Sequence, residues 1–163
     1  MTYILEVCVD SVQSAVAAQK GGADRVELCS ALVIGGLSPS VAMFRQVKEN
    51  TDLKIRVLLR PRFGDFCYDE YEFRTLKDEV KQFRELGADG VVIGILRPDG
   101  TLNMEQMEEL VKAAGDMGIT MHRSFDVCRD AYQALEQCVS LGIDTILTSG
   151  QKRTAWEGRR LIS

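Results

Sequence analysis

The chain has 163 residues, of which 45% are hydrophobic and 27% charged, a composition typical of one globular domain. Twenty Lys and Arg against 24 Asp and Glu residues give a net charge of -4, and no basic run indicates nucleic-acid binding. The N-terminus lacks the basic and apolar segments of a signal peptide, and no stretch approaches the roughly 18 apolar residues of a membrane span. We therefore expect a cytoplasmic protein with neither nucleic acid nor membrane as a partner.

Six short segments rich in apolar and β-branched residues alternate with longer amphipathic segments. We expect strands at residues 4–9, 25–29, 54–60, 90–95, 119–122 and 145–148. Between them, apolar residues return at helical spacing, as in the set Leu76, Val80 and Phe83. Helix N-caps are expected at Asp69, with Glu72 three residues later, and at Ser38, directly before a proline. This alternation predicts an α/β fold with a parallel sheet.

A weak internal repeat marks the passages from helix to strand. Gly-Ala-Asp at 22–24 recurs at 87–89 and, as Gly-Ile-Asp, at 142–144. Each copy would end a helix at Gly and turn at Asp into a strand. The first strand lacks the Gly-rich phosphate loop of many doubly wound sheets. Since a full barrel usually needs about 200 residues or more, the sequence predicts a single domain over 1–163 of the parallel (β/α)8 TIM-barrel type, truncated to about six β-α units.

Within the strands, alternation places an unusual polar set on the face opposite the helices. The barrel interior would hold Glu6, Cys8, Glu27, Cys29, Arg60 and His122. Buried charges cost several kcal/mol each unless paired, so the two glutamates would need Arg56 or Arg60 nearby. Such a set is either a salt-bridge network that closes the barrel or part of a site at the C-terminal ends of the strands, where barrel active sites lie.

Polar loops after the third and fifth strands would add to that end of the barrel. One hypothesis is therefore an enzyme that acts on a small anionic metabolite, whose pocket would consist of Glu6, Glu27, Arg60, Asp65, His122 and Arg123. The arginines would hold the anion, and His122 or a glutamate would serve as acid or base. His122, the only histidine, could equally be a hydrogen-bonded core residue. No motif identifies a catalytic residue or a reaction, so whether the chain is an enzyme stays open.

Six ordered motifs resemble the CutC family of copper homeostasis proteins. They are EVCVDS at 6–11, GADRVELC at 22–29, GGLSPS at 35–40, RPR at 60–62 with GDF at 64–66, HR at 122–123 with FD at 125–126, and LTSG at 147–150. The resemblance implies a TIM-barrel fold, a cytoplasmic location and a proposed role in handling copper. RFG at 62–64 departs from the family's more familiar Arg-Gly-Gly. The family continues through two further strands that this chain lacks, and the unpaired sheet edges would favour a homo-oligomer.

The five cysteines form no CxxC motif and are expected to stay reduced. Cys8 and Cys29 lie in the same phase of adjacent parallel strands. If the two were in register, their Cβ atoms would lie about 5 Å apart, close enough to share one Cu(I) ion. The resemblance implies the same two positions, at which family members are proposed to bind copper. The alternative is that both thiols only fill the barrel as small hydrophobic side chains.

Overall fold

The computed structural model describes residues 3–163 and contains one six-stranded parallel sheet whose strand order follows the chain. The strands are β1 (Glu6–Val9), β2 (Arg25–Leu28), β3 (Lys54–Leu58), β4 (Gly90–Ile93), β5 (Gly118–Met121) and β6 (Thr145–Ile146). The α-helices are α1 (Val12–Lys20), α2 (Val41–Asn50), α3 (Glu70–Glu85), α4 (Met104–Ala114), α5 (Ala131–Ser140) and α6 (Ala155–Ile162). Two 3-10 helices, η1 (Leu32–Ile34) and η2 (Arg123–Val127), follow β2 and β5.

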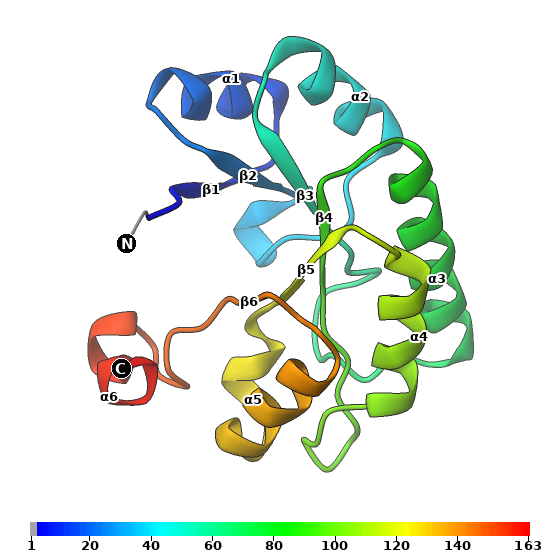
Figure 1. Ribbon diagram of the computed structural model, residues 1–163, viewed down its shortest axis with the longest axis vertical. Helices are drawn as coiled ribbons and strands as arrows, with labels where there is room; N and C mark the ends of the chain where they lie inside the picture. The colour runs from blue at the N-terminus through cyan, green and yellow to red at the C-terminus, as the bar shows by residue number, and fades with distance from the viewer. Residues whose placement is uncertain (1–2) are drawn as a thin grey trace.

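The sheet curls into part of a barrel. Helices α1 to α5 form an arc on its outer side, and the arc is open between β1 and α6 (Figure 1). Each strand is followed by a helix, so the predicted fold of six β-α units is confirmed. None of the helices within residues 3–163 is long and apolar enough to span a membrane.

The strands end earlier than the alternation predicts, at Leu28, Leu58, Ile93, Met121 and Ile146. Beyond these ends the chain stays extended and keeps single backbone hydrogen bonds to the neighbouring strand. Cys29 N donates to Val9 O at 2.9 Å, and His122 N donates to Ile93 O at 3.0 Å. Side-chain alternation continues through these residues, which is why the sequence pattern extends the strands too far. The consequence is that Cys29, Arg60 and His122 stand just past the strand ends.

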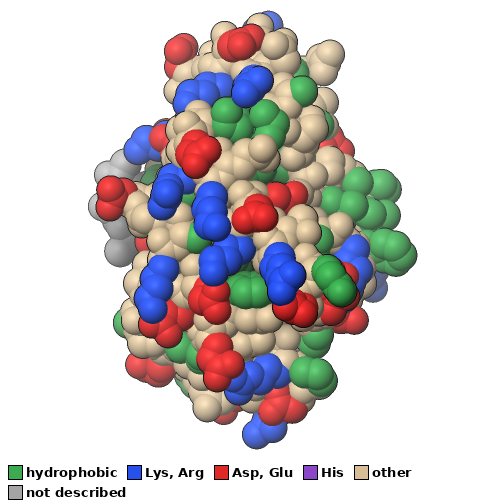
Figure 2. Space-filling model, turned by 90° about the vertical axis from the view of Figure 1, so that its right-hand side faces the viewer, with side chains coloured by type: hydrophobic (Ala, Val, Ile, Leu, Met, Phe, Trp, Pro, Cys, Tyr) green, Lys and Arg blue, Asp and Glu red, His purple; other side chains and the backbone are tan. Residues whose placement is uncertain are grey.

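The main hydrophobic core lies between the sheet and the helix arc. Its fully buried side chains include Val26, Leu28, Phe44, Leu76, Phe83, Ile93 and Leu110. Phe44 of α2 and Phe83 of α3 pack edge to face with ring centroids 5.4 Å apart. The predicted inner face of α3 is confirmed, since Leu76, Val80 and Phe83 are all buried. On the outer surface over α3 and α4, Lys and Arg mix with Asp and Glu side chains (Figure 2).

The repeated Gly–Asp turns tie each helix end to the start of an earlier strand. In each copy the Asp carboxylate accepts a hydrogen bond from a backbone N–H: Asp24 from Leu5 (2.7 Å), Asp89 from Ile55 (2.8 Å) and Asp144 from Ile119 (2.7 Å). The glycine that opens each copy has a positive φ, between 73° and 86°. Glycine adopts this left-handed conformation without steric penalty, which explains the repeat.

Asp89→Ala should lower the free energy of unfolding by about 1–2 kcal/mol, because it leaves the N–H of buried Ile55 without its acceptor. Urea denaturation would measure the change. The control is Asp78→Ala, since Asp78 is 79% exposed and forms only a 3.6 Å pair with Lys81. Its effect should stay within about 0.5 kcal/mol. Equal losses for both variants would show that the Asp89 hydrogen bond has no special role.

The helix caps agree with the sequence except at α2. Asp69 caps α3 in a capping box with Glu72, as predicted. The predicted cap at Ser38 is wrong, because α2 begins after Ser40, whose side chain accepts from Met43 N. The Ser38 hydroxyl instead accepts from Arg60 N at 2.9 Å and donates to Glu79 at 2.8 Å. Ser38 therefore holds the chain just after β3, where the candidate site lies.

Candidate functional site

A cavity of about 50 Å³ lies on the inner side of the sheet, at and just past the C-terminal ends of the strands. Its lining consists of Glu27, Gly35, Leu58, Arg60, Phe66, His122, Arg123 and Leu147. Buried side-chain polar atoms are normally hydrogen-bonded. In residues 3–163 four such atoms have no partner, and three belong to this lining: Glu27 Oε2, Arg60 Nε and His122 Nε2. Their concentration in one cavity marks it as the candidate binding site.

Arg60 brings a buried positive charge that no carboxylate neutralises. Its Nη1 donates to Gly36 O at 3.3 Å and its Nη2 to Gly64 O at 2.8 Å. The guanidinium also packs on the Phe66 ring, 5.0 Å from the centroid. Among the described residues, none of the ion pairs includes Arg60. The free Nε–H and the uncompensated charge suit an anionic ligand.

His122 offers the cavity a hydrogen-bond donor. Its Nδ1 accepts from Ser124 N at 3.2 Å, so this nitrogen carries no proton and the neutral ring carries its proton on Nε2. Burial, with a contribution from the charge of Arg60, lowers the pKa of His122 to about 3. The imidazole is therefore neutral near pH 7. Its unpartnered Nε2–H is available to donate a hydrogen bond to a ligand, and this nitrogen is unsuited to act as a base.

The His122 ring is held in one orientation. It packs on Phe66 with ring centroids 4.8 Å apart, and Ser124 N donates to its Nδ1. Gly94 approaches so closely that a Cβ there would lie 2.6 Å from His122 Cε1 and 2.2 Å from Ser124 Oγ. Only glycine fits at this position without displacing the ring or the hydroxyl.

Among residues 3–163, Glu27 is the only one that brings a carboxyl to the lining of the cavity. Its side chain is buried, and the predicted pairing with Arg56 or Arg60 does not form. Arg56 instead donates to Asp144 at 2.7 Å, and Glu6 pairs with Arg25. Burial raises the pKa of Glu27 to about 7; the charge of Glu6 adds to this shift and Arg25 opposes it. Glu27 can therefore exist with or without its proton near neutral pH.

The structure brings together four of the six predicted pocket residues. Arg123 lines the cavity beside Glu27, Arg60 and His122, but its charge is engaged by Asp126 at 2.5 Å. Glu6 begins β1, at the opposite end of the strands, and does not reach the cavity. Asp65 lies in the loop after β3 with its side chain 68% exposed, paired with Arg62 at 3.0 Å.

The two predicted copper ligands lie on neighbouring strands without being in register. Cys8 pairs with Glu27 in the ladder, so Cys29 stands two residues further along the chain, just past the end of β2. Strand spacing and rise then put the two Cα atoms about 8 Å apart on the same face. Cys29 is fully buried and donates its S–H to Val9 O at 3.5 Å, whereas Cys8 is exposed on the edge strand.

Both thiols are disfavoured as thiolates. Desolvation by neighbouring protein atoms, followed by the charges of Glu27 and Glu6, raises the pKa of Cys8 to about 12. This holds although the Cys8 side chain is partly in contact with solvent. The pKa of Cys29 is also raised to about 12, by burial first and then by Glu27, Cys8 and Asp10. Within residues 3–163 no group of three or more His, Cys, Asp or Glu residues is placed to hold a metal. The donor set therefore fits at most a two-sulfur site whose thiols lose their protons to the metal.

Sequence reasoning missed Phe66 and Gly94. Phe66 forms the apolar wall against which both Arg60 and His122 pack, and no spacing pattern indicates this contact. Gly94 did leave a signal. It interrupts an apolar strand pattern, and a glycine in such a place often marks a close approach of another group.

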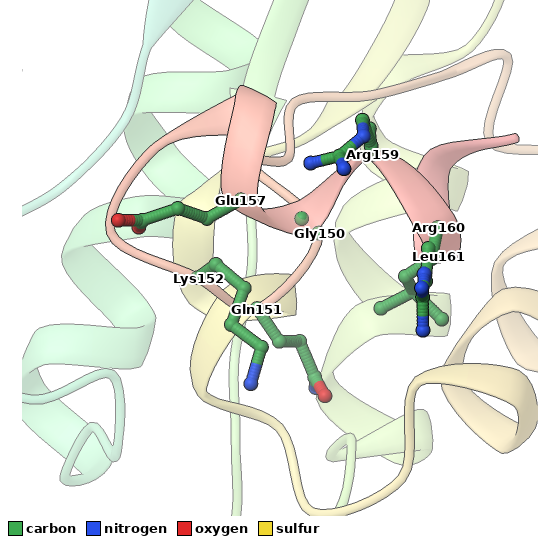
Figure 3. A pocket seen from close by; sticks show the side chains of 8 residues that line it. Gly150, Gln151, Lys152, Glu157, Arg159, Arg160 and Leu161 are labelled. Atoms are coloured by element: carbon green, nitrogen blue, oxygen red, sulfur yellow. The ribbon is translucent and has the colours of Figure 1, made fainter.

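A larger hollow, of about 530 Å³, lies between the loop after β6 and helix α6. Figure 3 shows that the side chains of Lys152, Glu157 and Arg160 in its lining point in different directions. None of the buried unpartnered polar atoms of residues 3–163 belongs to this lining. The smaller cavity therefore remains the better candidate.

Comparison with known proteins identifies the family. The sequence profile of the CutC family matches residues 3–163. The chain belongs to the CutC family. A CutC protein of Bacteroides fragilis is 48% identical over 163 residues, which cover 98% of this chain and 64% of the relative. A CutC protein of Histophilus somni is 40% identical over 158 residues, covering 97% of this chain and 65% of the relative. The chain thus spans slightly less than two thirds of the length of these CutC relatives.

Solved structures agree with this assignment. A CutC structure from Streptococcus agalactiae, whose name proposes a role in copper homeostasis, superimposes with a TM-score of 0.90 at 29% identity. The match covers 98% of this chain and 80% of that one. A Schiff base-forming fructose-1,6-bisphosphate aldolase matches with a TM-score of 0.55 at 22% identity, over 93% of this chain and 61% of that one. At that identity the likeness shows the fold alone.

Proposed function

We propose that this CutC-family chain binds a small anionic metabolite in the cavity at the C-terminal ends of its strands, as part of an enzyme active site. The observation that carries this proposal is the buried Arg60, whose charge has no carboxylate partner and whose Nε is free. Arg60 would hold the anion, and His122 would donate a hydrogen bond from Nε2. Glu27, the only carboxyl in the lining, would exchange a proton with the ligand.

Calorimetric titration with acetate, pyruvate, inorganic phosphate and sulfate tests this proposal. Arg60→Met should weaken binding of the preferred anion about 100-fold, because a charge-assisted hydrogen bond and the buried charge are both lost. Arg62→Met is the matched control, since Arg62 lies outside the cavity and pairs with Glu72 and Asp65. Its affinity should equal that of the wild type. The proposal fails if no anion of the panel binds, or if Arg60→Met binds as well as wild type.

A second candidate function is the handling of Cu(I) in the cytoplasm. Two observations support it: Cys8 and Cys29 lie on the same face of adjacent strands, and the S. agalactiae relative carries a copper homeostasis name. All five cysteines are free, and a reducing cytoplasm supplies both thiols and Cu(I). In this role copper would be the ion that the protein carries, and not a resident cofactor.

An anaerobic Cu(I) titration against a competing chelator tests the copper candidate. One tightly bound ion is expected, and it should be lost when Cys8 and Cys29 are both changed to serine. Cys67→Ser is the control, because Cys67 is a half-buried thiol in the loop after β3. This substitution should leave the stoichiometry unchanged. Copper affinity should also be indifferent to Arg60→Met. Binding that survives the double substitution would leave Cys8 and Cys29 as packing residues.

A further inference from the structure

We infer that the anion taken by the cavity is a short 2-oxo carboxylate, with its carboxylate on Arg60 and its oxo oxygen on Nε2–H of His122. This inference rests on the proposed function and assigns the substrate class of the same site. It follows from three properties of the cavity: the charge it can balance, the donor that His122 presents, and the size and polarity of the walls.

The cavity can balance one negative charge. Two arginines line it, but the guanidinium of Arg123 is engaged by the Asp126 carboxylate and by Ser149 Oγ at 2.6 Å. Only Arg60 remains unneutralised, and its Nη1 and Nη2 already donate to backbone carbonyls, which leaves Nε–H as its unpartnered donor. Glu27 adds no positive charge, and in its protonated form it adds no negative charge that would compete with the ligand. A monoanion such as a carboxylate therefore fits better than a dianion such as a phosphate monoester.

The second donor is neutral and fixed in direction. Ser124 N–H can only donate, so Nδ1 of His122 must accept and the proton of the neutral ring must sit on Nε2. Phe66 against the ring face and Gly94 against its edge prevent the ring from turning. A neutral N–H beside a single cation suits an uncharged oxygen adjacent to the carboxylate. A preorganised donor of this kind is also where negative charge could develop on a carbonyl oxygen.

The walls limit the ligand to a few atoms. The cavity has a volume of only about 50 Å³, and the rest of its lining beside the charged and polar side chains includes the apolar Leu58, Phe66 and Leu147, so a long hydroxylated chain does not fit. Two or three carbons are therefore expected, as in glyoxylate or pyruvate. An aliphatic monocarboxylate of equal length would satisfy Arg60 but leave His122 Nε2–H unpaired, which costs about a tenfold loss of affinity for one hydrogen bond.

The test compares pyruvate with propionate, which differ at the oxo oxygen. Calorimetry should give pyruvate about tenfold tighter binding than propionate. His122 is the only histidine, so a ¹⁵N-labelled sample gives a single set of imidazole resonances. These resonances can be assigned without a mutation. Pyruvate should shift the Nε2–H resonance, while propionate should leave it near its ligand-free position.

Two substitutions sharpen the result. His122→Asn keeps an acceptor for Ser124 N–H but lacks a donor at the Nε2 position, so it should remove the preference for pyruvate. His122→Gln places an amide N–H near that position and should restore part of it. Equal affinities for pyruvate and propionate, both lost in Arg60→Met, would overturn this inference and leave the proposed function standing. Failure of every anion to bind the wild-type chain would overturn both, and a preference for phosphate over pyruvate would overturn the substrate class alone.

Discussion

Replacing Gly94 by alanine should lower the free energy of unfolding by about 3 kcal/mol, because the new methyl overlaps two buried side chains and cannot be accommodated without repacking. A Cβ at this position would lie 2.2 Å from Ser124 Oγ and 2.6 Å from His122 Cε1. The His122 ring would have to move away from residue 94, which displaces its Nε2–H from its present position in the cavity. Chemical denaturation measures the stability loss, and the imidazole resonances report the displaced ring.

Gly21→Ala is the control for this substitution. A Cβ at Gly21 meets only ordinary contacts of 3.4 Å, and its φ of -79° suits any residue. We expect the unfolding free energy of Gly21→Ala to match or slightly exceed that of the wild type. A Gly94→Ala variant with unchanged stability and unchanged imidazole resonances would show that the ring is not held as described.

Replacing Arg56 by methionine should cost about 3 kcal/mol of stability, or roughly 6–12 °C in Tm for a chain of this size. Arg56 is buried, and its guanidinium donates to Thr120 Oγ1 at 2.5 Å, Thr145 Oγ1 at 3.2 Å and Asp144 Oδ1 at 2.7 Å. These bonds join β3 to β5 and β6 across the inside of the sheet. Methionine fills a similar space but removes the guanidinium donor from both hydroxyls and from the Asp144 carboxylate, which keeps only its bonds from Ile119 N and Thr145 Oγ1.

Arg74→Met provides the comparison, because Arg74 pairs with Glu70 on the exposed surface of α3 with its side chain 65% exposed. Such a pair contributes little, and the expected change is below about 0.5 kcal/mol. Thermal denaturation followed by circular dichroism distinguishes the two variants. A Tm difference of about 2 °C is on the order of the effect of one weak surface pair. If the Tm of Arg56→Met lay within that range of the Tm of Arg74→Met, the inner network would have no stabilising role.

The two predictions concern opposite ends of the same strands. Arg56 is the middle residue of β3, and its guanidinium reaches the starts of β5 and β6, where the turn residue Asp144 pairs with it. Arg60 lies just past the C-terminal end of that strand, where its charge is left unpaired. This division follows the general pattern of parallel β/α barrels, in which one end supplies stability and the other supplies the active site. The contrast between two arginines four residues apart is the main support for the proposal that the cavity binds an anion.

The order and type of the elements were determined by local sequence properties. Alternation identified all six strands, helical spacing identified the buried face of α3, and the Gly–Asp repeat identified the helix-to-strand turns. These predictions succeed because each depends on residues close in sequence, whose side-chain directions follow from the period of a strand or a helix. The ordered motifs identified the CutC family for the same reason.

Only the tertiary structure decided which polar side chains share a space and which are neutralised. Alternation placed Glu6 and Glu27 on one face, yet Glu6 pairs with Arg25 at one end of β1 while Glu27 lines the cavity. The two-residue offset between Cys8 and Cys29 likewise depends on strand register. Register, charge pairing and close approaches such as that of Gly94 to His122 arise between segments far apart in the chain. The period of a single strand determines the face on which a side chain lies, and the packing of several strands determines its neighbours.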